Sequence, residues 1–214
     1  MARLTRTESQ ARTRTDLLST ARDMFLSDGY AKTSLERVAE EAGYSKGAVY
    51  SNFKTKSALC LEVLGLIHET KFEELSGLIA GTDDFEAQMQ RFEGWAERTL
   101  GDVGWTMLEF EFAIVARDDP DLQAALVSSL SMMRGAVAAQ LQVLLDSMDL
   151  TLPMSADDAA TSILSLGLGL GIQRAVDPGI SARLITDAVR AMMASAQPGS
   201  NGSAASIRRD SAGA

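Results

Sequence analysis

Hydrophobic residues recur at intervals of three and four positions along most of the 214-residue chain. This spacing places them on one face of an α-helix, whereas a half-buried β-strand would alternate hydrophobic and polar positions. Only four prolines interrupt the pattern, and no segment carries a convincing strand signal. The pattern therefore predicts an all-α fold of about nine helices.

Glycine, proline and short polar runs separate the predicted helices, as residues that end or begin helices do. The main breaks are Gly29, Gly43, the runs 81–84 and 101–104, and Pro153. The predicted helices cover about residues 13–27, 33–42, 45–53, 56–78, 85–100, 105–117, 120–147, 155–176 and a last segment from residue 181.

The second and third predicted helices are short and close together. Thr33 and Glu36 have the spacing of a capping box, in which each side chain bonds a free backbone N–H of the other. Gly43 follows the last apolar position, and Ser45 can cap the next helix. Two short helices that meet at a glycine-containing turn are typical of a DNA-binding helix-turn-helix.

The order of residues in this segment carries a family resemblance. The matching positions are Thr33, Val38, Ala39, Ala42, Gly43, Ser45, Gly47, Tyr50, Phe53 and Lys56. About the first sixty residues therefore resemble the N-terminal domain of the tetracycline-repressor (TetR) family of bacterial transcription regulators. The resemblance implies a homodimer that binds a double-stranded, palindromic DNA operator and leaves it when a small-molecule effector binds, with repression as the family default.

Geometry and the resemblance together suggest DNA contacts. Thr33, at a helix N-terminus, and Tyr50 and Lys54, near the end of the second short helix, are candidates for phosphate contact. The opening residues of that helix are candidates for contact with base edges: Ser45, Lys46, Gly47 and Ala48. The alternative is that Tyr50 is a core aromatic residue and Lys54 a solvated cap.

Charge divides the chain in the same place. Residues 1–60 carry ten Lys or Arg and seven Asp or Glu, whereas the whole chain has a net charge of −9. A protein so acidic can approach DNA only with its basic end. Residues 1–14 hold four arginines and one acid, which suggests a flexible arm able to follow phosphates; a disordered start to the chain is the alternative.

The middle of the chain is rich in aromatic residues and methionine. The family resemblance implies an effector pocket there, lined by Trp95, Trp105, Glu109, Phe112 and Met132, and either Glu109 or Glu111 could be its polar anchor. The alternative is that these residues are ordinary core. A buried, unpaired glutamate would be costly, so the ligand would be a cation or a protein base would pair with the acid. The predicted effector is thus small and hydrophobic or cationic.

The last two predicted helices are apolar around most of their circumference. Such helices need cover on several sides, and the resemblance implies that they pair with their mates in a four-helix bundle. The candidate interface residues are Leu164, Gly167, Leu168, Gly171, Ile185 and Val189. Burial of the same residues within one chain is the alternative.

Other classes of function lack the necessary residues. The chain has one histidine, His68, and one cysteine, Cys60, so we expect no enzyme, catalytic group, metal site or cofactor. We read His68 as a packing or surface residue and Cys60 as a small buried hydrophobic residue. The single cysteine suits a cytoplasmic location, and the apolar run 163–172 is too short to span a membrane.

The predicted organisation has three parts. Residues 1–54 form an arm and a helix-turn-helix domain, residues 55–196 a helical domain for effector binding and dimerisation, and residues 197–214 a disordered tail rich in Ser, Gly and Ala. Two functions compete with the ligand-responsive regulator. One is a constitutive DNA-binding regulator with a filled core, and the other is a helical ligand-binding protein without a DNA function.

Overall fold

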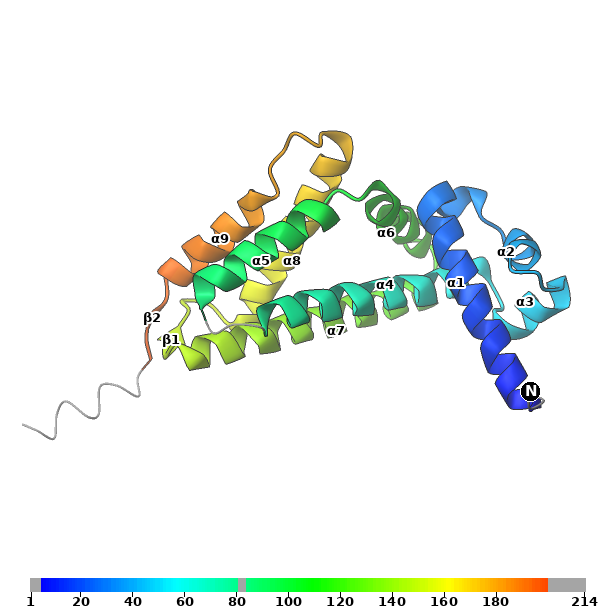
Figure 1. The fold of residues 1–214 in the computed structure, drawn as a ribbon, viewed down its shortest axis with the longest axis horizontal. Helices are drawn as coiled ribbons and strands as arrows, with labels where there is room; N and C mark the ends of the chain where they lie inside the picture. The colour runs from blue at the N-terminus through cyan, green and yellow to red at the C-terminus, as the bar shows by residue number, and fades with distance from the viewer. Residues whose placement is uncertain (1–4, 81–83, 200–214) are drawn as a thin grey trace, which may run out of the picture.

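The computed structural model describes residues 5–80 and 84–199, and nearly all of these are helical, which confirms the all-α prediction. In chain order the helices are α1 (Arg6–Lys32), α2 (Leu35–Glu41), α3 (Lys46–Asn52), α4 (Lys56–Ile79), α5 (Phe85–Thr99), α6 (Val103–Ala116), α7 (Pro120–Ser147), α8 (Ala156–Val176) and α9 (Arg183–Ala194). Helices α1–α3, here called the head, lie at one end (Figure 1). Helices α4–α9, the body, extend away from it, with α4 and α7 along the length.

Helix α1 begins earlier than the hydrophobic pattern predicts. Thr5 caps it in a capping box: its hydroxyl accepts from the N–H of Glu8, and the Glu8 carboxylate accepts from the N–H of Thr5 at 2.7 Å. This bond lowers the pKa of Glu8. The prediction of a flexible arm is therefore wrong from residue 5 onward, because capping and the continuation of α1 hold a segment that buries no apolar side chain. Residues 1–4 lie outside the described residues.

The end of α1 is interrupted at Gly29. Its φ of 82° is left-handed, so the helix is broken there and one further turn, Tyr30–Lys32, follows. Thr33 comes after that turn. It is 2% exposed, and its hydroxyl donates to the carbonyl of Gly29 at 2.9 Å.

The two short helices are capped by serines. Ser34, not Thr33, is the N-cap of α2, and its hydroxyl accepts from the N–H of Arg37 at 3.2 Å. Ser45 caps α3 in the same way. Gly43, with φ of 75°, makes the turn between them, as its position in the sequence predicts.

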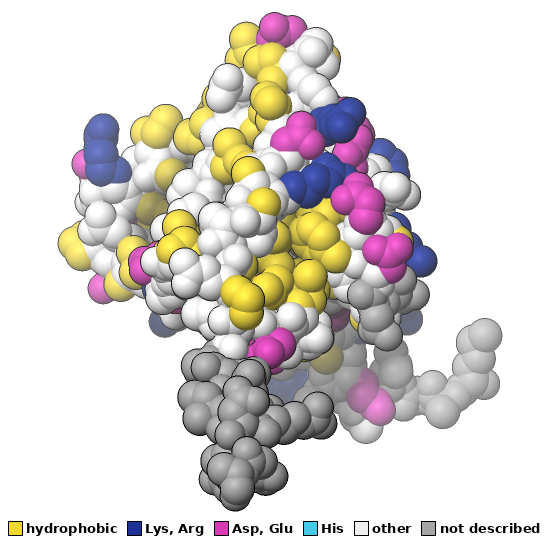
Figure 2. Space-filling view, turned by 90° about the vertical axis from the view of Figure 1, so that its left-hand side faces the viewer, with side chains coloured by type: hydrophobic (Ala, Val, Ile, Leu, Met, Phe, Trp, Pro, Cys, Tyr) yellow, Lys and Arg dark blue, Asp and Glu magenta, His cyan; other side chains and the backbone are white. Residues whose placement is uncertain are grey.

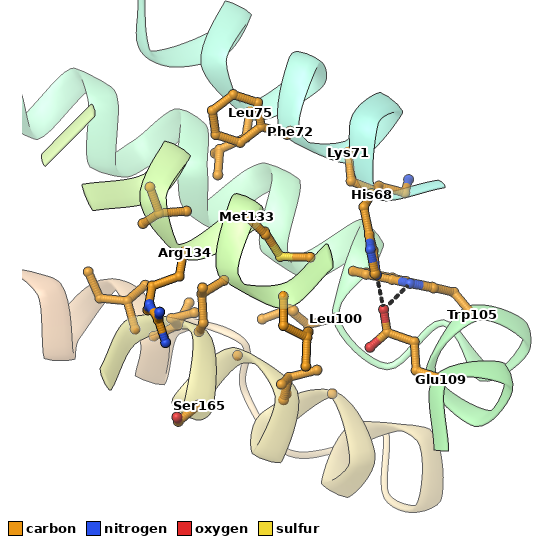
Figure 3. A pocket seen from close by; sticks show the side chains of 18 of the residues that line it. His68, Lys71, Phe72, Leu75, Leu100, Trp105, Glu109, Met133, Arg134 and Ser165 are labelled. Carbon is orange, nitrogen blue, oxygen red and sulfur yellow. Dashed lines mark hydrogen bonds and ion pairs between the residues drawn. The ribbon is translucent and has the colours of Figure 1, made fainter. Parts of the chain in front are cut away.

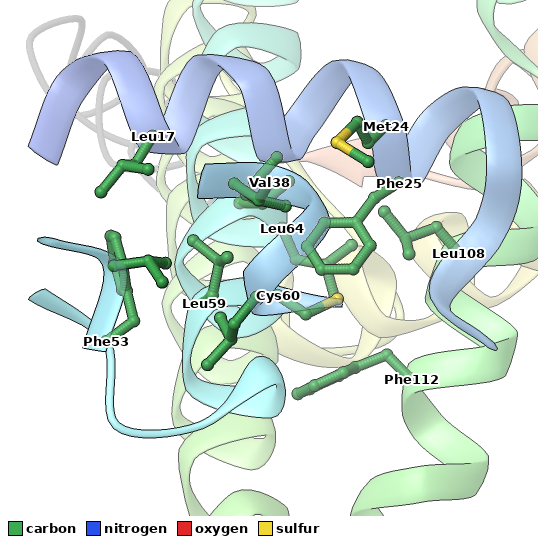
Figure 4. Packing of buried hydrophobic residues seen from close by; sticks show 14 of the residues in the cluster. Leu17, Met24, Phe25, Val38, Phe53, Leu59, Cys60, Leu64, Leu108 and Phe112 are labelled. Carbon is green, nitrogen blue, oxygen red and sulfur yellow. The ribbon is translucent and has the colours of Figure 1, made fainter. Parts of the chain in front are cut away.

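The core of the head continues into the body. Figure 4 shows Phe25, Val38 and Phe53 of the head packed with Leu59 and Leu64 of α4 and with Leu108 and Phe112 of α6. The phenylalanines among them are at most 2% exposed. Cys60 lies in this cluster, and burial raises the pKa of its thiol to about 12. The hydrophobic core thus crosses the predicted boundary after residue 54, so the head is anchored directly on α4 and α6.

A second hydrophobic core lies among α5, α7, α8 and α9, and hydrogen bonds between polar groups connect its helices. Arg174 of α8 is 9% exposed, and its guanidinium donates to the carbonyl of Leu100 at 2.8 Å and to the carboxylate of Glu97 at 2.9 Å. Glu97 also accepts from the N–H of Ala182 at 3.0 Å, which supplies the cap that the start of α9 lacks. A Cβ on Gly101 would lie 2.5 Å from that of Arg174, so glycine permits this close approach.

Figure 2 looks at the end of the molecule formed by α5 and α9, where hydrophobic side chains gather in a hollow bordered on one side by acidic and basic side chains. Arg190 of α9 contributes to the ion pairs that join these helices. Its guanidinium lies 2.6 Å from the carboxylate of Glu86 and 3.2 Å from that of Asp187. These pairs are partly exposed, so their contribution to stability is small.

Part of the predicted tail is ordered. Gln197–Pro198 (β2) pairs in antiparallel fashion with Leu150–Thr151 (β1), which corrects the prediction of disorder for these residues. The amide of Gly199 also donates to the carbonyl of Asp149 at 2.7 Å. Residues 200–214, and positions 81–83 of the predicted break, lie outside the described residues.

Helices α7 and α8 are long and apolar enough, by length and composition alone, to cross a membrane. The run 163–172 is only part of the 21-residue helix α8, so its length does not exclude a span as the sequence argument supposed. Within the described fold the two helices pack against each other and against α4 and α6. Core helices of soluble proteins have the same composition but are mostly buried, whereas none of the apolar window of α7 and 28% of that of α8 is buried within the described fold.

Candidate nucleic-acid interface and cavity

The outer face of the head is formed by the start of α3. Ser45, Lys46 and Gly47 are exposed and Ala48 is half-buried, whereas Val49 points into the core. A Cβ on Gly47 would meet only the hydroxyl of Ser45, at 3.7 Å, so the backbone there is open to a close approach. Because these residues follow the N-cap, free N–H groups and the positive end of the helix dipole lie beside the ammonium group of Lys46. This end of α3 can therefore receive an anion and donate hydrogen bonds.

Tyr50 and Lys54 extend the same surface. Tyr50 is 49% exposed, so it is not the core residue of the alternative interpretation. Its hydroxyl donates to the carboxylate of Glu36 in α2 at 2.5 Å. This bond raises the pKa of Tyr50 and lowers that of Glu36. The phenol thus already has a partner and would have to leave Glu36 to bind a phosphate, whereas Lys54 is exposed.

Thr33 does not belong to this surface. It is buried, with its hydroxyl bonded to the end of α1, so the prediction that it contacts phosphate is wrong. The error arose because Thr33 and Ser34 are adjacent and either can cap a helix. Ser34 is the residue at the free N-terminus of α2 and takes the predicted position.

Sequence reasoning also missed what holds α3 in place. The guanidinium of Arg14, from α1, lies 4.4 Å from the ring centre of Phe53 and donates to the carbonyl of Asn52 at 3.1 Å. It also pairs with Glu62 of α4. The charge pattern of residues 1–14 predicts that Arg14 belongs to a flexible arm. Arg14 instead connects α1, the end of α3 and α4.

The body contains a cavity of about 310 Å³ between α4, α5, α6, α7, α8 and α9. Its wall is mostly apolar and includes five aromatic side chains, which are Phe72, Phe92, Trp95, Trp105 and Phe110. Aliphatic side chains from α7 and α8 also line the cavity. A volume of this size and character suits a small, largely apolar ligand.

Polar groups gather at one end of this cavity (Figure 3). One oxygen of the Glu109 carboxylate accepts from the indole N–H of Trp105 at 2.8 Å and pairs with Nε2 of His68. The side chains of His68 and Glu109 are 9% and 16% exposed. The interpretation of His68 as a packing or surface residue is therefore corrected, since it pairs with the acid of the cavity. Its spacing of 41 residues from Glu109 gave no local signal.

The opposite face of α6 holds the head. Oε2 of Glu111 accepts from the backbone N–H groups of Tyr30 and Ala31, at 2.6 and 3.2 Å. These amides begin the short turn after Gly29, so Glu111 caps that turn from another element. Lys56 adds a bond from its ammonium group to the carbonyl of Tyr30 at 2.9 Å. Two acids separated by one residue on α6 thus contact different regions, the cavity and the head.

Comparison with known proteins agrees with the division of the chain into a head and a body. The family model described as bacterial regulatory proteins, tetR family, matches residues 17–63. A segment of 70 residues is 39% identical to the HTH-type transcriptional regulator TtgR of Pseudomonas putida and covers 33% of each chain. A segment of 63 residues is 43% identical to AcrR of Shigella flexneri, over 29% of each. These matches thus span about a third of the curated relatives.

The fold of the whole chain is also found in a solved structure of another protein. A solved structure assigned to the TetR-family regulators, from Mesorhizobium loti, superposes with a TM-score of 0.68 at 24% identity, over 90% of this chain and 99% of that one. Residues 17–63 match the TetR family, and the whole chain has the fold of a solved TetR-family structure. The curated relatives that match the N-terminal third are named as transcriptional regulators.

The residues predicted for the TetR-family effector pocket fall in three places. Trp95, Trp105 and Glu109 line the cavity. Phe112 does not, because it is fully buried in the core that joins head and body. Met132 lies on the outer side of α7 and is 69% exposed, while its neighbour Met133 faces the cavity. One position along a helix turns a side chain by about 100°, which the composition of the segment could not resolve.

The residues predicted for the dimer interface are mostly internal. Gly171, Ile185 and Val189 are buried within the chain, and a Cβ on Gly167 would contact Ile185 of the same chain at 3.4 Å. Leu164 is half-buried at the cavity. Of the six, only Leu168 is exposed, at 42%. The intrachain alternative therefore holds for Gly171, Ile185 and Val189, because the inward faces of α8 and α9 are needed to cover α5 and the cavity.

The outward faces of α8 and α9 carry exposed apolar side chains beside polar ones, which include Arg183 and Asp187. Their exposed residues include Leu166, Val176 and Leu184, at 37%, 78% and 52%. Gly169 lies on the same side of α8, and a Cβ there would meet nothing within 4 Å. Together with Leu168 of the predicted set, these residues are the part of the two helices that a second copy could contact.

Proposed function

We propose that this chain is a TetR-family transcriptional repressor that binds a palindromic DNA operator as a homodimer. The exposed start of α3, with Lys46 and Gly47 at a capped N-terminus, carries the proposal. Its size and position on the head suit insertion into a major groove. Lys46 and Ala48 would meet base edges, and Lys54 with the N-termini of α2 and α3 would meet phosphates.

The exposed apolar side chains on the outward face of α8 and α9 support the homodimer. Leu166, Val176 and Leu184 are exposed there, and burial of such side chains drives association. Pairing two copies about a two-fold axis would place their α3 helices in successive major grooves, about 34–36 Å apart. A palindromic operator follows from that symmetry.

The cavity supports release by a small, largely apolar effector. Because α6 lines the cavity through Glu109 and caps the head through Glu111, a ligand that shifts α6 would reorient the head on α4. A ligand can favour release only as far as it binds one arrangement better than the other. Glu109 already has the protein partners His68 and Trp105, so its burial does not depend on a cationic effector.

The test is binding to the DNA that flanks the gene, measured by fluorescence anisotropy across a salt series. The parent is expected to bind tightly with a steep salt dependence. Lys46→Ala and Lys54→Ala should each weaken binding and lower the magnitude of the log–log salt slope by about one. Arg98→Ala removes an exposed charge from α5 and should change neither quantity.

The opposite results would overturn the proposal. A folded protein that binds DNA at no salt concentration would make the cavity, not the head, the functional part of the molecule. Equal losses from Lys46→Ala and Arg98→Ala would indicate a non-specific effect of charge rather than an interface on α3.

A further inference from the structure

The polar end of the cavity has more acceptors than donors. Glu109 uses one carboxylate oxygen for both of its contacts, with His68 and with the indole of Trp105. Its second oxygen is directed away from both residues, toward the interior of the cavity (Figure 3). Within the described residues, no hydrogen bond to that oxygen is formed. A carboxylate oxygen can only accept, so this position offers an acceptor to a ligand.

The histidine adds a second unused position. Nδ1 of His68 is buried and has no hydrogen-bond partner in the described part of the chain. A proton on Nδ1 would be a buried donor without an acceptor, which is costly. The favoured arrangement therefore places the single ring proton on Nε2, facing Glu109, and leaves Nδ1 as an acceptor.

The rest of the wall is mostly apolar, because aromatic side chains dominate it. Its possible donors are the cations Lys71 and Arg134 and the hydroxyls of Thr106, Thr161 and Ser165. Lys71 lies 3.4 Å from Glu74. Arg134 lies 3.3 Å from Asp157, but its buried Nε has no hydrogen-bond partner in the described part of the chain. A ligand of this cavity therefore meets a largely apolar wall in which the free oxygen of Glu109 is an unoccupied acceptor.

We propose that the cavity selects an aromatic molecule that carries a hydrogen-bond donor, an O–H or N–H, which it gives to the free oxygen of Glu109. This inference rests on the proposed role of the cavity as the effector site and adds the chemical class of the effector. A molecule of the same shape with only an acceptor at that position would leave two acceptors facing each other. Glu109 is then the residue that determines specificity.

Three naphthalene probes of similar shape test the proposal by isothermal titration calorimetry on the full chain. 2-Naphthol carries a neutral donor, 2-naphthylmethylamine a charged donor, and 2-methoxynaphthalene an acceptor alone. Both donors are expected to bind about tenfold or more tightly than the methoxy compound, as a bond to a charged acceptor provides. Equal affinity of all three probes would contradict the proposal that the cavity selects a hydrogen-bond donor.

The variant Glu109→Gln sharpens the test. Its amide oxygen can still accept from Trp105 and His68 while its NH₂ group faces the cavity. The preference for 2-naphthol should then fall to about one or reverse in favour of 2-methoxynaphthalene. Glu73→Gln makes the same change at an exposed position on α4 and should leave the preference unchanged. If Glu109→Gln kept the preference for 2-naphthol, that preference would have to arise from a group other than Glu109.

Failure of this inference can be distinguished from failure of the proposed function. If Glu109→Gln does not fold, the ratio of probe affinities in the parent decides alone. If the parent binds operator DNA but shows no donor preference, the ligand class is wrong while the DNA-binding function stands. If the donors bind selectively to a protein that does not bind DNA, the class holds and the proposed function fails.

Discussion

The hydrophobic side chains of the head fill a core, whereas those of the body also line a cavity. In the head, Phe25 and Phe53 are at most 2% exposed and fill the space between α1, α3 and α4. In the body, Trp95 and Phe92 also line a cavity of about 310 Å³. A filled core has one favoured arrangement, whereas a cavity leaves neighbouring helices room to adjust. The chain thus combines a rigid reading surface with an adaptable body, and α6 belongs to both.

The largest expected effect is on the free energy of unfolding, and two phenylalanines of α6 are compared to test it. Phe112→Ala empties the core between head and body and should lower the free energy of unfolding by about 3–5 kcal/mol. Phe110→Ala, at a position 37% exposed beside the cavity, should lower it by less than about 1 kcal/mol. Chemical denaturation followed by circular dichroism measures both. Similar losses would contradict the division between a filled and an open region.

A smaller effect is expected where α6 meets α1. A Cβ on Gly104 would lie 2.5 Å from the carbonyl oxygen of Leu26, so Gly104→Ala should cost about 1–3 kcal/mol by forcing the helices apart. Gly135→Ala, on α7, meets nothing within 4 Å and should stabilise the protein by up to about 1 kcal/mol. Thermal unfolding distinguishes the two. A neutral Gly104→Ala would show that the joint between head and body is loose.

Glu111, the acid of α6 that joins the body to the head, can be tested by itself. Glu111→Gln keeps an acceptor but removes the charge from the cap on Tyr30 and Ala31, at a cost of about 1 kcal/mol. Amide hydrogen exchange at these two residues should become faster, while exchange at Val49 in α3 changes less. Glu73→Gln is the control. Unchanged exchange at Tyr30 and Ala31 would show that Glu111 does not hold the head.

The smallest effect is expected at the surface of the head. Tyr50→Phe removes the bond to Glu36, whose pKa is lowered in the folded state because Tyr50 donates to it. A lowered carboxyl pKa stabilises the fold above the unfolded pKa, about 4.3, and that contribution is lost as the pH falls through the folded pKa. The thermal midpoint of the parent should therefore slightly exceed that of the variant at pH 7, and the difference should become smaller as the pH is lowered to 3. An equal difference at both pH values would contradict a role for Glu36.

The helix-turn-helix could be predicted because its signals are local. Gly43 and Ser45 specify the turn and the cap within three positions, and these residues behave as the sequence indicates. Thr33 shows the limit of the same reasoning. Two adjacent residues could both cap α2, and only packing against the end of α1 decides that Thr33 is buried and Ser34 free.

The cavity could be predicted only in outline. Composition indicated the aromatic segment, and Trp95, Trp105 and Glu109 do line the cavity. Met132 and Phe112 were misplaced because the pattern of one helix does not show which neighbour covers each side. His68 was missed because its partner, Glu109, belongs to another helix 41 positions away.

The sequence by itself determined the helices, their main breaks, the basic head and the residues at the start of α3. These features depend on backbone capping, glycine conformation and hydrophobic period, which act over a few residues. Tertiary structure alone decided the pairing of Glu109 with His68, the cap that Glu111 places on the head and the inward burial of Ile185. Such contacts join segments that are distant in the chain, and their geometry depends on how whole helices pack.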